Sequence, residues 1–157
     1  MADIGVVAMN LFGLDVLSRV VHIATAITLV GGSIFMAIAM IPSLEMIPNE
    51  QRAAFVSAVR DRWKRYVHGG IGLFLLSGFY NYFRAIPKHQ GDGLYHALLG
   101  TKMLLAFVIF FLASVMVGRS AKFESWRQNP SKVLRVMIIL AVLIVAMSGF
   151  LKIRGWQ

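Results

Sequence analysis

Apolar residues gather along the chain in four long blocks, and the stretches between them hold most of the charges. The blocks cover about residues 15–41, 65–83, 94–118 and 133–151. About 20 apolar residues span the ~30 Å hydrocarbon core of a bilayer as a helix. The pattern therefore predicts an all-α fold, an integral membrane bundle of four transmembrane helices, with residues 1–157 in a single transmembrane four-helix domain.

The flanks of the blocks carry their own signals. Residues 1–14 predict a short interfacial lead-in. Pro42 predicts the end of the first span, because proline disfavours helical geometry in the residue before it. Apolar and basic residues alternate at helical spacing over about 50–62, which predicts an amphipathic surface helix. The second span is rich in small residues, and small residues let membrane helices approach closely. They are Gly69, Gly70, Gly72, Ser77 and Gly78.

Composition supports a lipid environment. Hydrophobic residues make up 58% of the chain, charged residues 15%, and the mean hydropathy is +0.71. Soluble domains carry about 25% charged residues. The absence of cysteine excludes disulfides, thiolate metal sites and a cysteine nucleophile. No phosphate-binding loop or nucleophile elbow is present, so ATP hydrolysis and acyl transfer have no support.

The formal charge of +9 is distributed unevenly. Lysine and arginine concentrate on the cytoplasmic side of membrane proteins and attract anionic lipid, so no nucleic-acid partner is implied. The links after the first and third spans hold Arg52, Arg60, Arg62, Lys64, Arg65, Arg119, Lys122, Arg127 and Lys132. The other side holds Arg19, Arg84, Lys88, Lys152 and Arg154. This bias predicts a multi-pass protein of the bacterial inner (plasma) membrane with both termini outside.

Two ionisable residues lie inside the apolar blocks, and such residues are functional candidates by default. At ~1.5 Å per residue, His22 lies roughly 10 Å inside the outer edge of the first span. Lys102 lies roughly 12 Å inside the third span, which enters from the same side. The two side chains can therefore meet across the bundle.

A neutral imidazole and a neutral amine both bind metals, and bundle cofactors sit between facing helices. His22 and Lys102 could hold the iron of a planar porphyrin, with His96 as the substitute ligand. Arg19 and Arg84 could pair with the porphyrin propionates, and Tyr95 could line the pocket. These residues predict an iron porphyrin held between the first and third spans.

Simpler interpretations of the same residues stay open. Lys102 could reach the headgroups by extending its side chain, and His96 could be an interfacial residue. His22 could hydrogen-bond a backbone carbonyl, Thr25 or Thr28. The methionines could be copper ligands or ordinary core filler.

The motif HIATAITLVGGSIFMAIAMIP in the first span resembles the first helix of the CopD-like membrane family. A basic RWKRYVHGGIGLFLLSG stretch before the second span, and His96 and Lys102 early in the third, extend the resemblance. The wider group includes the HemJ-type protoporphyrinogen oxidases. That resemblance implies haem b bound by His22 and Lys102.

Three functions follow for comparison. The first is a haem b-binding membrane redox protein, acting in electron transfer or as a HemJ-like oxidoreductase that oxidises a porphyrinogen. The second, from the CopD-like resemblance, is copper transport, with His22, His96, Met36, Met40 and Met103 as candidate donors. The third is a non-catalytic subunit of a larger membrane complex, or a homo-oligomer in the lipid bilayer.

Overall fold

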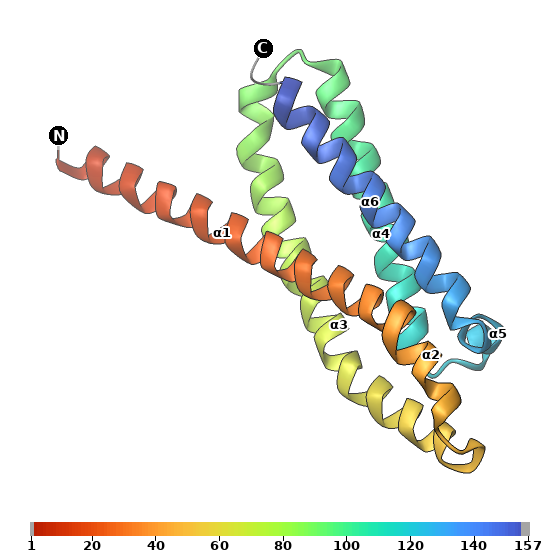
Figure 1. Cartoon of the computed structure of the whole chain (residues 1–157). Helices are drawn as coiled ribbons and strands as arrows, with labels where there is room; N and C mark the ends of the chain where they lie inside the picture. Colours follow the sequence, from red (N-terminus) through yellow and green to blue (C-terminus); the bar gives the residue numbers. More distant parts are fainter. Residues whose placement is uncertain (1, 155–157) are drawn as a thin grey trace.

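The computed structural model describes the backbone of residues 2–154 and the side chains of residues 11–154. Within that part of the chain every regular element is helical, which confirms the all-α prediction. Four long helices are joined by short helical segments (Figure 1). The elements are α1 (Ala2–Phe35), the π-helix η1 (Met36–Met40), α2 (Ile41–Ser43), η2 (Leu44–Met46), α3 (Asn49–Ala85), η3 (Ile86–His89), α4 (Gly93–Val117), η4 (Ala121–Phe123), α5 (Glu124–Gln128) and α6 (Pro130–Arg154).

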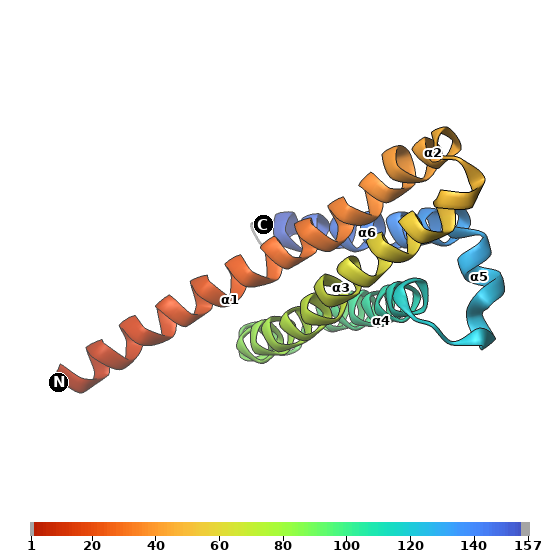
Figure 2. The same cartoon turned by 90° about the horizontal axis from the view of Figure 1, so that it is seen from below.

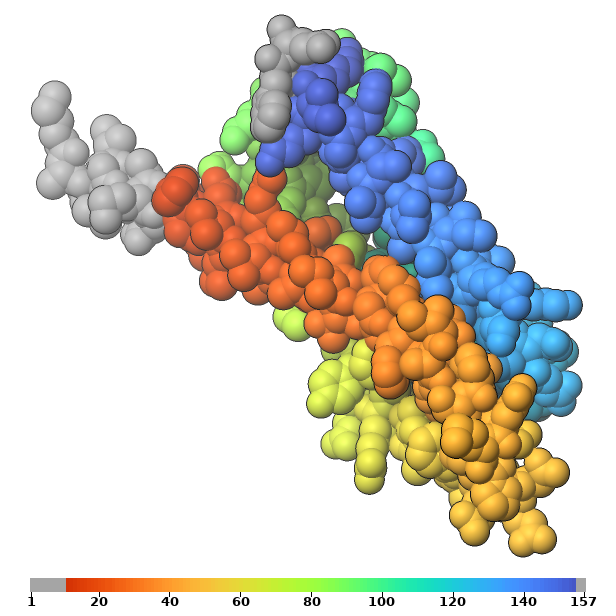
Figure 3. Space-filling model, viewed as in Figure 1, coloured from red at the N-terminus to blue at the C-terminus, as the bar shows by residue number. Residues whose placement is uncertain are grey.

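The long helices form a bundle from two main pairs. α1 packs on α3, and α4 packs on α6, while α3–α4 and α1–α6 contacts close the bundle. A small core of Leu112, Leu134 and Met137 joins α4 to α6. The N-terminal part of α1 diverges from the other helices in both views (Figures 1 and 2). The rest of α1 lies across α3 and beside α6 (Figure 3).

Three stretches of the described chain are long and apolar enough to cross a membrane. They are Leu11–Met46, Gly93–Val117 and Pro130–Arg154. Large apolar side chains on their outer faces are exposed, including Phe12, Ile27, Leu104 and Val145. These faces suit a lipid environment. The fourth predicted span lies in α3, which does not meet the same criterion.

The surface helix predicted at about 50–62 and the span predicted at 65–83 are one continuous helix, α3. No glycine or proline interrupts residues 50–68. Of the glycines further on, Gly70 and Gly78 face α1, where their lack of a side chain is useful. The predicted lead-in at 1–14 is likewise continuous with the first span, since α1 begins at Ala2.

The prediction that Pro42 ends the first span is wrong. The helix widens to a π-helix just before Pro42, with the Ile41 N–H donating to the Met36 carbonyl, and then continues. A proline ring clashes with the carbonyl four residues earlier, and a π-bulge is one way for a helix to accommodate such a disruption. The helical path ends at Ile47, which is extended and precedes Pro48.

Contact between α1 and α3 follows a regular spacing. The α1 residues that face α3 are Asp15, Ser18, His22, Leu29 and Gly32. With the buried Thr25, they repeat at alternating intervals of three and four positions. This is the spacing of a left-handed coiled-coil seam, in which two helices pack at a shallow angle. We call this contact the α1–α3 seam.

Glycines bring the two helices together at three points of the seam. A Cβ on Gly32 would overlap the indole of Trp63. A Cβ on Gly70 would lie 3.0 Å from Leu29, and one on Gly78 would lie 3.3 Å from the His22 ring. By contrast, Gly69 and Gly72 face open space. The predicted close packing of the second span therefore rests on Gly70 and Gly78.

Two carboxylates tie helices together on the side of the bundle away from α5. Arg84 donates from Nε and Nη2 to the two oxygens of Asp15, at 2.8 and 2.7 Å, and Tyr80 donates to Asp15 at 2.9 Å. Asp92 caps α4 by accepting from the Tyr95 N–H at 3.0 Å. It also accepts from Arg154 at 3.0 Å, which ties the start of α4 to the end of α6.

Gly32→Ala is expected to lower the thermal unfolding midpoint of the purified protein, because the added methyl group displaces the Trp63 indole. Overfilling a packed interior costs about 1–3 kcal/mol. Tryptophan fluorescence during heating in detergent measures the change. The matched control is Gly31→Ala, whose methyl group meets open space, so its midpoint should stay near that of the wild type. Equal decreases in the unfolding midpoint of both variants would contradict the close approach of α1 and α3 at Gly32.

The folded protein is expected to lose stability in acid because of Asp92. Its Tyr95 N–H donor, and then Arg154, lower the pKa of Asp92 below its ordinary value. The stabilisation is complete above the unfolded pKa of about 3.9 and is lost as the pH falls through the lower folded value. Asp92→Asn keeps a capping side chain but does not titrate. Unfolding midpoints measured from about pH 5 to pH 3 should fall more steeply in the wild type. Parallel curves would contradict the prediction.

Candidate functional site

A cavity of about 340 Å³ lies inside the bundle, at the end away from α5. α1 contributes Arg19 and His22, α4 contributes Tyr95 and Lys102, and α3 and α6 complete the wall. Four of the six predicted site residues therefore line one cavity. The volume lies in the range of ~300–1,000 Å³ that small-molecule sites occupy.

His22 is held by a hydrogen bond across the α1–α3 seam. Its Nδ1 lies 3.0 Å from the hydroxyl oxygen of Ser77. The Ser77 hydroxyl has one proton, which it donates to the Leu73 carbonyl at 2.7 Å. With that proton donated to Leu73 the hydroxyl accepts, which favours the tautomer of His22 that is protonated at Nδ1. This tautomer leaves a lone pair on Nε2, the form in which an imidazole binds a metal.

The His22 ring is also fixed by its packing. It lies against the Phe74 ring, with 4.0 Å between centroids and an angle of 43°. The absence of a side chain on Gly78 leaves room for the ring edge. Phe74 in turn packs edge-on against Phe110 of α4, at 5.4 Å. Three residues of α3 therefore orient the imidazole. They are Ser77 through its hydroxyl, Phe74 through its ring, and Gly78 through the space it leaves.

Lys102 and Arg19 supply positive charge to the same cavity. Lys102 is half-buried, and within residues 11–154 no carboxylate pairs with its ammonium group. His22 is close enough to both cations to interact with them electrostatically. Arg19 is exposed at the rim, near Tyr95. A molecule that fills this cavity would meet two cationic side chains and one neutral imidazole. Such a lining favours an anionic molecule that carries a metal to which an imidazole nitrogen can bind.

The other two predicted site residues lie outside the cavity lining. His96 donates from Nε2 to the His89 carbonyl at 3.0 Å, so it is committed to the loop before α4. Arg84 is occupied by Asp15 on the surface of the seam. In this structure, therefore, neither His96 nor Arg84 is placed to serve as a substitute ligand or a propionate partner in the cavity.

The donor set limits the kind of metal site that can form. No group of three or more histidine, cysteine or carboxylate side chains converges within the described residues. A bare metal ion needs three or four such ligands, as in zinc sites. A haem iron needs only one or two axial ligands from the protein. The residues present fit a macrocycle better than a bare ion.

Sequence reasoning missed Ser77, Phe74 and Gly78 as neighbours of His22. It offered Thr25 and Thr28 as hydrogen-bond partners, yet Thr28 donates to the Ala24 carbonyl of its own helix. The signal that would have found Ser77 is the alternating three- and four-residue spacing in α1, which puts His22 on the same face as Ser18 and Leu29.

Comparison of the chain with protein-family models, with curated proteins and with solved structures finds no match. The CopD-like and HemJ-type resemblance therefore stays a prediction from the motifs quoted above.

Ser77→Ala should loosen the tautomer of His22, because it removes the acceptor for the Nδ1 proton. Histidine-selective ¹⁵N NMR in detergent distinguishes the two ring nitrogens, and the wild type should show a protonated Nδ1. The variant should show a shift toward a mixture of tautomers. The control is Ser33→Ala, which removes a similar back-bond to the Leu29 carbonyl but leaves the histidine untouched. An unchanged His22 signal in Ser77→Ala would contradict the assignment.

Proposed function

We propose that this chain is a haem b-binding integral membrane redox protein, with the iron held between α1 and α4 in the His22 cavity. The supporting observation is an imidazole whose Nδ1 lies 3.0 Å from the Ser77 hydroxyl, in a cavity shared with Lys102 and Arg19. The single histidine matches the small number of protein ligands that a haem requires.

Each cavity residue has a role in this proposal. Nε2 of His22 would hold the iron together with the amine of Lys102, whose ammonium group would lose a proton on binding. Ser77 and Phe74 hold the imidazole in the orientation needed for binding. Arg19, at the rim, pairs with a propionate, and Tyr95 lines the pocket beside it. Aromatic side chains of α3 and α4 line the rest of the pocket. When bound, haem supplies a one-electron redox centre.

The reaction is electron transfer or a HemJ-like porphyrinogen oxidation. The copper alternative is less well supported, because its candidate donors do not converge. Met103 lines the His22 cavity, Met36 and Met40 line a different one, and His96 lines neither. The third alternative, a subunit of a larger membrane complex or a homo-oligomer, stays compatible with haem binding, since a redox centre needs an electron partner.

The proposal includes four membrane spans. The second half of α3 exposes the apolar side chains of Leu73, Leu76 and Phe83 on its outer face, which supports a place for it in lipid. The basic residues near α5 and at the start of α3 favour a cytoplasmic position for that end of the bundle. Both termini would then lie outside the bacterial inner membrane, and the cavity would lie toward the outer half.

His22→Ala is expected to abolish the haem absorption of the protein. Chains expressed with ample haem precursor and purified in mild detergent should show a Soret band in the wild type. The variant should lose at least about tenfold in bound haem per chain, the factor equivalent to ~1.4 kcal/mol. A pyridine haemochrome assay measures it and identifies the haem as type b.

The matched control is His68→Ala. His68 is exposed on the same bundle and hydrogen-bonds the Lys64 carbonyl of its own helix, so it is remote from the cavity. Its haem content should equal that of the wild type. Colourless wild-type protein, or equal haem loss in both variants, would overturn the proposal.

A further inference from the structure

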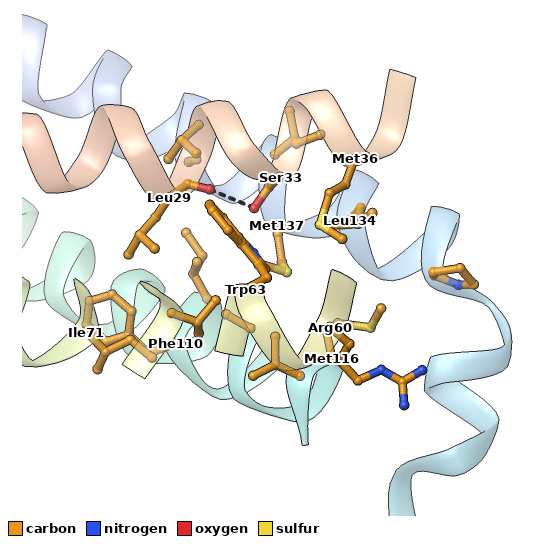
Figure 4. Close-up of a pocket in the computed structure, with 18 of the residues that line it drawn as sticks. Leu29, Ser33, Met36, Arg60, Trp63, Ile71, Phe110, Met116, Leu134 and Met137 are labelled. Atoms are coloured by element: carbon orange, nitrogen blue, oxygen red, sulfur yellow. Dashed lines mark hydrogen bonds between the residues drawn. The ribbon is translucent and has the colours of Figure 1, made fainter. Parts of the chain in front are cut away.

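A second cavity, of about 200 Å³, lies between α1, α3, α4 and α6 at the α5 end of the bundle. The rings of Phe74 and Phe110 line both cavities and stand between them. Figure 4 shows its interior, where the Trp63 indole extends from α3 toward Leu29 and Ser33 of α1. The lining is almost wholly apolar except for Ser33 and two arginines.

One of these arginines has an unsatisfied buried group. Arg127 is only 7% exposed. Its Nε and Nη2 donate to Glu124 at 3.2 and 2.5 Å, and Nη2 also donates to the Ser120 carbonyl at 2.6 Å. Its Nη1 is buried and has no hydrogen-bond partner in the described part of the chain. A buried donor without an acceptor costs ~1–3 kcal/mol, and more when charged. Nη1 itself is closed off, so Arg127 adds positive charge to the cavity lining rather than an open donor.

The second arginine strengthens the positive charge at the same place. Arg60 of α3 lines this cavity and is half-buried. Nearby carboxylates are already used, since Glu124 pairs with Arg127 and Asp61 pairs with Arg119. No carboxylate pairs with Arg60 within residues 11–154. The mouth of the cavity thus offers an anion the donors of Arg60 and the charge of both arginines.

The rest of the lining matches a hydrocarbon chain. Methionine side chains are flexible and adapt to irregular apolar shapes. Four of them line this cavity: Met36, Met40, Met116 and Met137. Basic pockets between membrane helices bind the headgroups of anionic lipids. An apolar cavity with arginines at its mouth requires a ligand that is anionic at one end and hydrocarbon at the other.

We propose that this cavity binds an anionic glycerophospholipid. One acyl chain lies between the four long helices, and the phosphate accepts hydrogen bonds from Arg60, with the charge of Arg127 in the same lining. This site is separate from the proposed haem site and does not depend on it.

The test compares thermal unfolding of delipidated full-length protein with different additions. Phosphatidylglycerol should raise the unfolding midpoint, whereas phosphatidylcholine with the same acyl chains, sodium oleate and inorganic phosphate should raise it much less. Native mass spectrometry should show one retained phosphatidylglycerol per chain. Equal effects of the two phospholipids, or an equal effect of oleate or phosphate alone, would overturn the proposal.

The test variant is Arg60→Gln. Arg127 is kept, because it also anchors α5 by donating to the Ser120 carbonyl, and replacing it would disturb that segment. The apparent affinity for phosphatidylglycerol should fall by about tenfold, the equivalent of one charge-assisted hydrogen bond. Arg62→Gln is the matched control, since Arg62 is exposed on the same helix and lies outside the cavity. Equal losses in both variants would show a general surface effect and overturn the site.

Discussion

The close approach of α1 and α3 is the contact on which the rest of this structure depends. At Gly32, Gly70 and Gly78 a side chain on one helix would run into Trp63, Leu29 or His22 on the other. Because the hydrophobic effect gives little drive between helices in lipid, such close packing and hydrogen bonds supply most of the specificity. The α1–α3 seam uses both, with Asp15–Arg84 and His22–Ser77 as its polar links.

The seam also explains why the interior is divided in two. Phe74 lies against His22 on one side and against Phe110 of α4 on the other. This aromatic pair separates a cavity that carries His22 and Lys102 from one that carries Arg60 and Arg127. The proposed haem and the proposed lipid thus belong to different ends of one bundle, and each end has charges that suit its own ligand.

Sequence patterns predicted much of this arrangement, and the failures have physical causes. The apolar blocks located three membrane-length helices, and helical depth correctly placed His22 and Lys102 along one cavity. The depth argument could not assign His96, because the loop carbonyl that binds it depends on how η3 folds back. The prediction that the helix ends at Pro42 was wrong because the helix widens to a π-helix before the proline and then continues. Ser77 was missed because its role comes from a contact 55 positions away in sequence.

One dimension of α3 has a mechanical consequence. The helix has 37 residues and is therefore ~55 Å long, almost twice the ~30 Å thickness of a hydrocarbon layer. Seven charged residues, between Glu50 and Arg65, lie in the first half of the helix. The side chains that orient His22 lie in its second half. A displacement of the first half, by a partner or by the headgroup layer, would be transmitted along one unbroken helix to the side chains that orient His22.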